Sequence, residues 1–156
     1  MAVVLKWFGK ECEKQILSAT EQAVMKGCFM IEKDVKTSMQ PGTGREYKRG
    51  GKIHRASVTG QPPAVDSGRL RASIASNWSG SGLANGNVTN PKQSGDGVSM
   101  PPTEPNKFTG RVGTNVFYGK ILEYGSVKMG PRPFLRPAFE KNISKIRNLF
   151  ENLIKK

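Results

Sequence analysis

Apolar and small residues recur at intervals of three and four through the first forty residues, which is the spacing of a helix with one buried stripe. Charged residues of both signs occupy the other positions, as on a solvated face. Pro41 cannot continue the hydrogen bonds of a helix, and Gly42 suits the conformation in which a helix ends. The pattern therefore predicts a long helix over residues 1–40. Its stripe consists of Leu5, Phe8, Cys12, Ile16, Ala19, Ala23, Gly27, Met30, Ile31 and Val35.

Residues 41–63 carry too few apolar side chains to build a core, and their glycines and charges predict a basic loop. Two interpretations stay open. The loop is either a basic arm that binds phosphates through counterion release, or a flexible surface segment that becomes ordered when subunits meet. Its candidate contacts with a partner or with DNA are Arg45, Lys48, Arg49, Lys52 and Arg55.

Two short segments show the two-residue alternation of strands. The first follows a turn, with even-numbered apolar positions running from Leu70 to Trp78, and the second covers residues 108–115. Between them, residues 79–107 are rich in Gly, Ser, Asn and Pro, which predicts a long flexible insertion. We expect this insertion either to become ordered against a neighbouring subunit or to remain disordered.

The last part of the chain combines two helical patterns with a stiff corner. Residues 117–124 have helical spacing, and Gly125 suits the end of a short helix. In RPFLRPAF the prolines fix the backbone around a hydrophobic pair, and Pro137 suits the first turn of a final helix. We expect the stripe of that helix to be core, with a subunit interface as the alternative. The stripe consists of Phe139, Ile143, Ile146, Phe150 and Leu153.

Together these elements predict a single α+β domain over residues 1–156. The long N-terminal helix and the C-terminal helix are expected to pack on a small, mainly antiparallel β-sheet. A long Gly/Ser/Asn/Pro-rich flap is expected to extend from this sheet, and residues 108–156 are expected to supply a strand, a short helix and the C-terminal helix.

The net charge is +13, from 25 Lys and Arg against 12 Asp and Glu. Such a charge would make copies of the chain repel one another unless an anionic partner or salt offsets it, so we expect some partner to be anionic. No apolar run approaches the about 18 residues of a membrane span, and the opening MAVVLKWFGK has too short an apolar core for a secretory signal. We therefore expect no membrane contact and a cytoplasmic location.

Few residues qualify for catalysis or metal binding. Cys12 and Cys28 lie more than four turns apart on one predicted helix, so they cannot bridge within it and should be reduced. The one histidine, His54, has no neighbour at a ligand spacing, and no pattern brings it to Asp66 and Ser67 as a catalytic triad. We expect no enzyme activity, cofactor or metal site, and we assign Asp66 and Ser67 to capping.

Glu123 is the one acidic residue in its block, and its role stays open between a contact with an arginine such as Arg132 or Arg136 and an exposed carboxylate. The guanidinium groups of Arg132 and Arg136 are suited to paired contacts with carboxylates of a neighbouring subunit. Both arginines are therefore candidate partner contacts.

Three blocks of sequence occur in one order: GQPPAVDSGRLRASI, GTNVFYGKILEYGS and RPFLRPAF. Together they resemble a family of small morphogenesis proteins of tailed bacteriophages, namely the neck, head-to-tail connector and tail-completion proteins, including the tail-component family of lambdoid phages. The polar stretch between Trp78 and Phe108 departs from the pattern of this family.

The resemblance implies a structural virion protein that joins or completes the head-tail interface, located at the head-tail junction or in the tail after assembly in the host cytoplasm. It also implies a homo-oligomeric ring, six-fold or twelve-fold, around the DNA channel. The implied partners are other head-tail junction and tail proteins, with non-specific contact with packaged DNA. The alternative is a basic nucleic-acid-binding protein, which the charge favours, although no helix-turn-helix, zinc finger or aromatic stacking motif is present.

Overall fold

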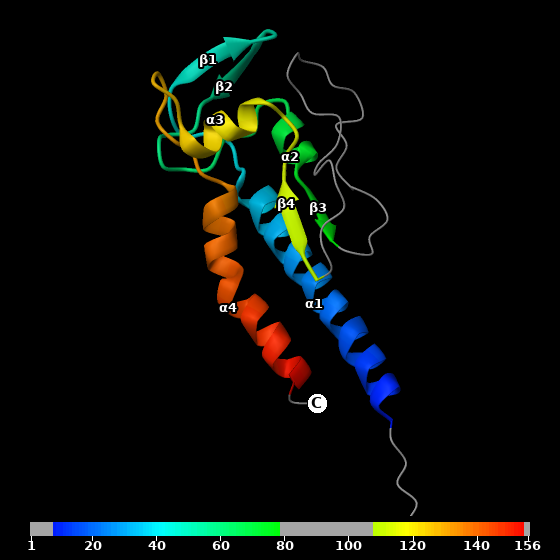
Figure 1. The fold of residues 1–156 in the computed structure, drawn as a ribbon. Helices are drawn as coiled ribbons and strands as arrows, with labels where there is room; N and C mark the ends of the chain where they lie inside the picture. The colour runs from blue at the N-terminus through cyan, green and yellow to red at the C-terminus, as the bar shows by residue number, and fades with distance from the viewer. Residues whose placement is uncertain (1–7, 79–107, 155–156) are drawn as a thin grey trace, which may run out of the picture.

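The structure is a computed structural model that describes residues 8–78 and 108–154, and Figure 1 shows two long helices lying side by side in it. Helix α1 covers Gly9–Ser38, and helix α4 covers Leu135–Ile154 and runs antiparallel to it. The two helices pack against each other and α1 packs on one of two small antiparallel sheets, so the predicted α+β class is confirmed. The predicted insertion at residues 79–107 lies outside the described residues.

Small residues and a buried polar contact join α1 to α4. A β-carbon at Gly27 would lie 3.3 Å from Ile146 Cγ1, so the glycine allows the two helices to approach closely. Asn142 is only 1% exposed, and its Nδ2 donates to Asp34 Oδ2 at 2.7 Å and to the Ala138 carbonyl at 2.9 Å. The hydrogen bond from Asn142 holds the pKa of Asp34 below its usual value. A polar residue therefore lies within the helix–helix contact.

The buried face of α4 is rotated relative to the predicted stripe. Ala138 and Asn142 are buried and Ile146 packs against the core, but Phe139 is 49% exposed and Ile143 is 44% exposed. Assigning the whole stripe to the core is therefore wrong for these two residues, which leaves an apolar strip on the outer side of α4.

The core lies where the end of α1 meets the start of α4. Phe134 is 1% exposed and is the largest of the fully buried side chains. The two prolines beside it hold the backbone in the turn that directs this ring inward. The core cluster consists of Ile31, Val35, Met39, Leu70, Ile74, Val116, Phe134 and Ala138.

Strands β3 (Ala75–Trp78) and β4 (Gly110–Gly113) form an antiparallel pair that packs on α1. Gly110 lies so close to α1 that a β-carbon there would overlap Cys28 Sγ. The strand predicted over residues 108–115 is confirmed within narrower bounds. The strand pattern predicted from Leu70 is wrong at its start, because Arg69–Ser73 forms the short helix α2.

Residues 41–63 do not form a loop throughout. Strands β1 (Glu46–Arg49) and β2 (Lys52–Arg55) make a hairpin whose turn is Gly50 and Gly51, with φ of 56° and 75°. Positive φ at both central residues is what a type I′ hairpin turn requires, and glycine meets it without steric strain. The predicted basic loop is therefore wrong for residues 46–55. Seven of the eight strand side chains are exposed, so the hairpin adds little to the core.

Helix α3 covers Tyr118–Tyr124 and ends at Gly125, whose φ is 82° and whose N–H donates to the Ile121 carbonyl. This end, and the place of Pro137 in the first turn of α4, confirm the predictions for both elements. None of the helices in the described ranges is both long enough and apolar enough to cross a membrane.

Candidate functional site

The carboxylate of Glu123 fastens α3 to the start of α4. Its Oε2 accepts hydrogen bonds from the backbone N–H of Phe134 at 2.8 Å and of Leu135 at 3.0 Å, and its Oε1 accepts one from the N–H of Arg136 at 2.9 Å. These donors lie at the N-terminus of α4, where N–H groups have no partner within the helix and a negative charge is favourable. Glu123 is 9% exposed, so the interpretation as an exposed carboxylate is wrong. The contact with Arg136 is present, but Arg136 makes it through its backbone N–H and not through its guanidinium group.

The side chains of Arg132 and Arg136 diverge from this cap. Arg136 is exposed, and its Nε donates to Glu140 Oε1 at 2.9 Å one turn along α4. Arg132 is half-buried, its N–H donates to the Leu122 carbonyl at 2.7 Å, and its Nη1 lies 3.3 Å from Met129 Sδ. The two arginines therefore reach different surfaces.

The five basic candidates of residues 45–55 lie on and beside the hairpin, and they differ in whether their charge is paired with an acidic residue. Arg55 pairs with Glu46 across the strands, with Nε 2.9 Å from Oε1. Arg45 is exposed just before β1. Lys48 and Lys52 are exposed and make no ion pair within the described part of the chain. These two lysines are therefore the freest charges on the hairpin.

Asp66 anchors the hairpin to the body of the protein. It forms an ion pair with Arg49 of β1, and its Oδ1 lies 2.9 Å from His54 Nδ1 of β2. His54 in turn stacks on Tyr47, with ring centroids 5.6 Å apart. The assignment of Asp66 to capping is therefore wrong. Ser67 Oγ does accept a hydrogen bond from the Arg69 N–H, at 3.4 Å, across the turn into α2.

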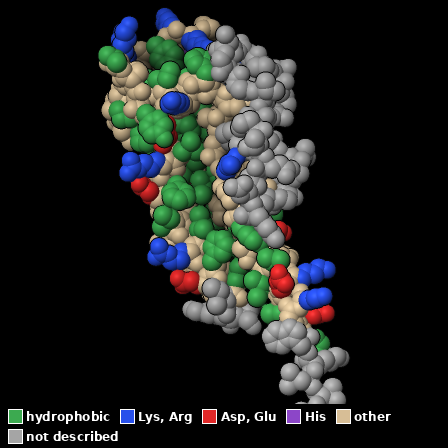
Figure 2. Space-filling model, viewed as in Figure 1, with side chains coloured by type: hydrophobic (Ala, Val, Ile, Leu, Met, Phe, Trp, Pro, Cys, Tyr) green, Lys and Arg blue, Asp and Glu red, His purple; other side chains and the backbone are tan. Residues whose placement is uncertain are grey.

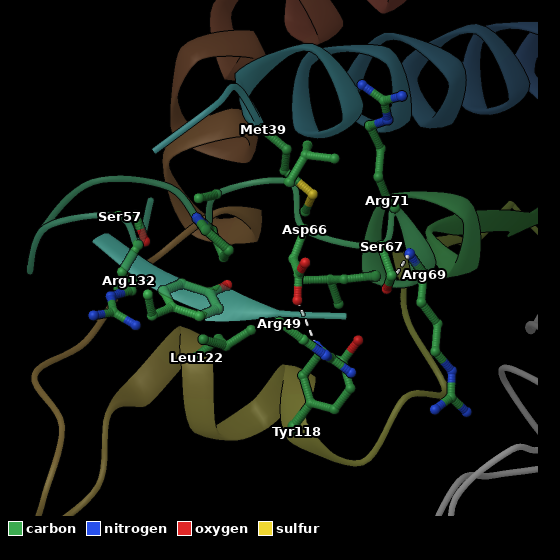
Figure 3. Close-up of a pocket in the computed structure, with 17 residues that line it drawn as sticks. Met39, Arg49, Ser57, Asp66, Ser67, Arg69, Arg71, Tyr118, Leu122 and Arg132 are labelled. Carbon is green, nitrogen blue, oxygen red and sulfur yellow. Dashed lines mark hydrogen bonds and ion pairs between the residues drawn. The ribbon is translucent and has the colours of Figure 1, made fainter. Parts of the chain in front are cut away.

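A cavity of about 370 Å³ lies beside this anchor, between the hairpin, residues 56–71 and α3. In Figure 3 Asp66, Arg49 and Tyr118 lie in its middle, while the side chains of Arg69, Arg71 and Arg132 extend outward in different directions. The arginines therefore do not converge on one anion. Burial raises the pKa of Tyr118, which keeps its hydroxyl protonated at neutral pH.

Both cysteines are free thiols, with Cys12 exposed and Cys28 buried. Burial, with the charge of Glu32, raises the pKa of Cys28 to about 11, so it remains a thiol at neutral pH. Across residues 8–78 and 108–154, no three His, Cys, Asp or Glu side chains are grouped to hold a metal ion.

Exposed apolar side chains form a second feature, on the face made by α3, β4 and α4. Figure 2 shows a band of apolar side chains running along this face, with charged side chains at its borders. A groove of about 580 Å³ opens within it, with Cys28 and Ile31 of α1 among its lining residues. The exposed Tyr124 of α3 and Phe139 of α4 line it, and Ile121 and Ile143 are exposed on the same two helices. Apolar patches of this kind commonly mark interaction surfaces.

Comparisons of this chain with protein-family models, with curated proteins and with solved structures give no match. The likeness to phage morphogenesis proteins therefore rests on the three sequence blocks alone. Glu123 of the block GTNVFYGKILEYGS accepts hydrogen bonds from the block RPFLRPAF. The block GQPPAVDSGRLRASI contains Asp66 and helix α2.

Proposed function

We propose that this protein is a structural subunit of a tailed-phage virion that joins or completes the head-tail interface, as part of a ring around the DNA channel. The main support is that two blocks of the phage-like pattern, GTNVFYGKILEYGS and RPFLRPAF, form one corner that is held by the three hydrogen bonds to Glu123. An assembly subunit requires a stiff frame that presents contact surfaces to neighbours. The exposed apolar side chains of α3 and α4, on either side of that corner, supply such a surface.

The charge distribution agrees with a position near DNA. The hairpin projects from one end of the molecule, away from the free ends of α1 and α4 (Figure 1), and carries the exposed Lys48 and Lys52. In a ring, such a hairpin would face either the channel or an anionic neighbour. Either location offsets the repulsion between copies that a net charge of +13 would cause.

The proposal is tested in particles of the phage or prophage that encodes the chain. We expect mass spectrometry of purified virions to detect the protein, and we expect deletion of its gene to leave heads and tails that do not join, visible by electron microscopy. Supplying the wild-type gene from a plasmid should restore complete particles. Normal infectious particles from the deletion would contradict the proposal.

A second function, nucleic-acid binding without a virion role, is favoured by one observation, the exposed basic hairpin. Lys52 directly follows its two-glycine tip, and Lys48 lies across the hairpin from Ile53, which is 65% exposed. A two-stranded ribbon of this kind can lie against a nucleic-acid groove. In this interpretation the protein binds mainly to phosphates, and the affinity depends strongly on salt.

A double variant, Lys48→Ala with Lys52→Ala, tests whether the hairpin binds DNA. We expect the double variant to bind a DNA duplex more weakly at low salt, and the slope of log affinity against log salt to fall by about 0.9 for each phosphate that is no longer neutralised. Fluorescence anisotropy over a salt series measures this. The matched control is Arg49→Ala, because this charge is already paired with Asp66 and its removal should loosen the hairpin rather than take away a free cation. A double variant with unchanged affinity at every salt concentration would show that the hairpin does not bind DNA.

A further inference from the structure

The acidic side chains around the hairpin are already paired, whereas many of the basic ones are not. Residues 41–71 contain seven basic residues and only two acidic ones, Glu46 and Asp66. Glu46 pairs with Arg55, and Asp66 pairs with Arg49. Both acidic charges are therefore neutralised within the segment, which keeps an excess of five positive charges. Such an excess attracts an anionic partner to this end of the molecule.

The cavity of about 370 Å³ beside the hairpin has the same imbalance of charge. Four arginines line it, and the one acidic residue that lines it is the paired Asp66. Arg71 is exposed and makes no ion pair with a described residue, and Arg132 Nε is buried without a hydrogen-bond partner among them. The four arginines are Arg49, Arg69, Arg71 and Arg132.

The side chains of Arg71 and Arg132 extend from opposite sides of this cavity (Figure 3). Groups that point apart cannot enclose a single carboxylate or phosphate, but each can contact a different charge of a long anion. Duplex DNA carries one negative charge per about 1.7 Å of its axis, so it offers a phosphate to each group. Arginine side chains commonly make such contacts, which position a protein on the duplex without reading its sequence.

A second copy of the chain is a poor partner for this basic surface. Each copy has a net charge of +13, and no two of its acidic residues are adjacent in the sequence. Another copy would therefore add positive charge and would offer no continuous row of carboxylates. Packaged DNA, in contrast, presents an unbroken row of phosphates to a subunit that surrounds it.

We propose that the arginines around this cavity bind the phosphate backbone of duplex DNA, with Arg71 and Arg132 as contacts on its two sides. The inference rests on the position near DNA that the proposed function gives this end of the molecule. The contact continues along the hairpin, where the exposed Lys48 and Lys52 neutralise further phosphates. Asp66 holds the hairpin beside the bound backbone through its ion pair with Arg49.

Two single variants, Arg71→Ala and Arg132→Ala, test this surface with a short fluorescent DNA duplex. We expect each variant to bind more weakly at low salt, and the slope of log affinity against log salt to fall by about 0.9, the value for one lost phosphate contact. Arg71→Lys should keep the wild-type slope, because the lysine retains the charge. Fluorescence anisotropy over a salt series measures all of these proteins.

Arg147→Ala is the matched control, because it lowers the net charge by the same amount at a different place. Arg147 is exposed, makes no ion pair with a described residue, and belongs to the C-terminal half of α4, which runs away from the hairpin (Figure 1). We expect this variant to keep the wild-type affinity and slope. Should Arg132→Ala lose helix content by circular dichroism, Arg132→Gln repeats the test, and the exposed Arg71 decides it in either case.

Three results would overturn the proposed surface. They are a wild-type protein that does not bind the duplex at low salt, an Arg71→Ala protein with wild-type affinity at every salt concentration, or an equal loss with Arg147→Ala, which would mean that affinity follows net charge alone. Tighter binding to polyglutamate than to the duplex would also reject it, in favour of an acidic protein. These measurements use purified protein, so their failure leaves detection of the chain in virions, and with it the proposed function, in place.

Discussion

Replacing Phe134 by alanine should lower the free energy of unfolding by about 3–5 kcal/mol, the range found for removing a buried phenylalanine ring. The ring is 1% exposed and belongs to the core cluster with Val35, Met39 and Ile74. Pro133 and Pro137 stiffen the backbone on both sides, so the corner cannot readily collapse into the cavity that alanine leaves. Since a domain of this kind has about 5–15 kcal/mol of stability, urea unfolding followed by circular dichroism should show a large shift of the midpoint.

Phe139→Ala is the matched control, because it removes the same ring from the same helical corner at a position that is 49% exposed. We expect it to cost less than about 1 kcal/mol, as substitutions away from the core usually do. Equal destabilisation by the two variants would mean that Phe139 belongs to the core and that the stripe predicted from the sequence is correct. A small effect at Phe139 would instead agree with a ring that lies outside the core.

The pattern of apolar positions predicts that α4 exists and roughly where it begins, but not which way it faces. Ala138 is too small and Asn142 too polar to count in an apolar stripe, yet both are buried against α1. Asn142 is accepted there because its NH₂ group donates to Asp34 of α1 and to the Ala138 carbonyl, which satisfies both of its donors. The partner on α1 lies 108 positions away, so no local pattern could reveal it.

The hairpin could not be predicted from its apolar pattern, for a different reason. Strands are predicted from alternation of apolar and polar residues, and EYKR and KIHR have almost none because both faces are wet. The available signal is the adjacent pair Gly50 and Gly51, since two glycines between short segments are typical of a type I′ turn. The anchor of the hairpin has no sequence signal, because Asp66 reaches Arg49 and His54 only after folding brings the turn before α2 against both strands.

The role of Glu123 could be predicted only in part. Its isolation among apolar and basic neighbours marks it as unusual, but the partner that the sequence suggests is a guanidinium group. The structure instead gives its carboxylate the N–H groups that every helix start leaves without partners. The PFLR segment places these three donors in a row, and the lone acid of α3 reaches them from 11 to 13 positions earlier in the chain.

Replacing Glu123 by alanine should lower the free energy of unfolding by about 1–3 kcal/mol, the cost of leaving a buried donor unsatisfied. The buried N–H of Phe134 loses its acceptor, whereas the N–H groups of Leu135 and Arg136 are only partly buried and can bond to water. Glu123→Gln should cost less, because one amide oxygen can still accept from part of this set, although its NH₂ group then faces N–H donors. Urea unfolding ranks the three proteins, and hydrogen exchange should speed up first at the amides of Phe134, Leu135 and Arg136.

Glu140→Ala is the control within α4, because that carboxylate is exposed and bridges to Arg136 one turn away. Exposed pairs at this spacing contribute about 0.3–0.5 kcal/mol, so the control should unfold almost as the wild type does. Equal destabilisation by the two alanine variants would show that Glu123 does not cap α4.

If instead Glu123→Ala stays folded but loses protection against hydrogen exchange only at the first turn of α4, the corner is held by Phe134 alone. A Glu123→Ala protein that is both unstable and unable to join particles, beside a Glu140→Ala protein that is normal in both respects, would tie the stiffness of this corner to the proposed assembly role.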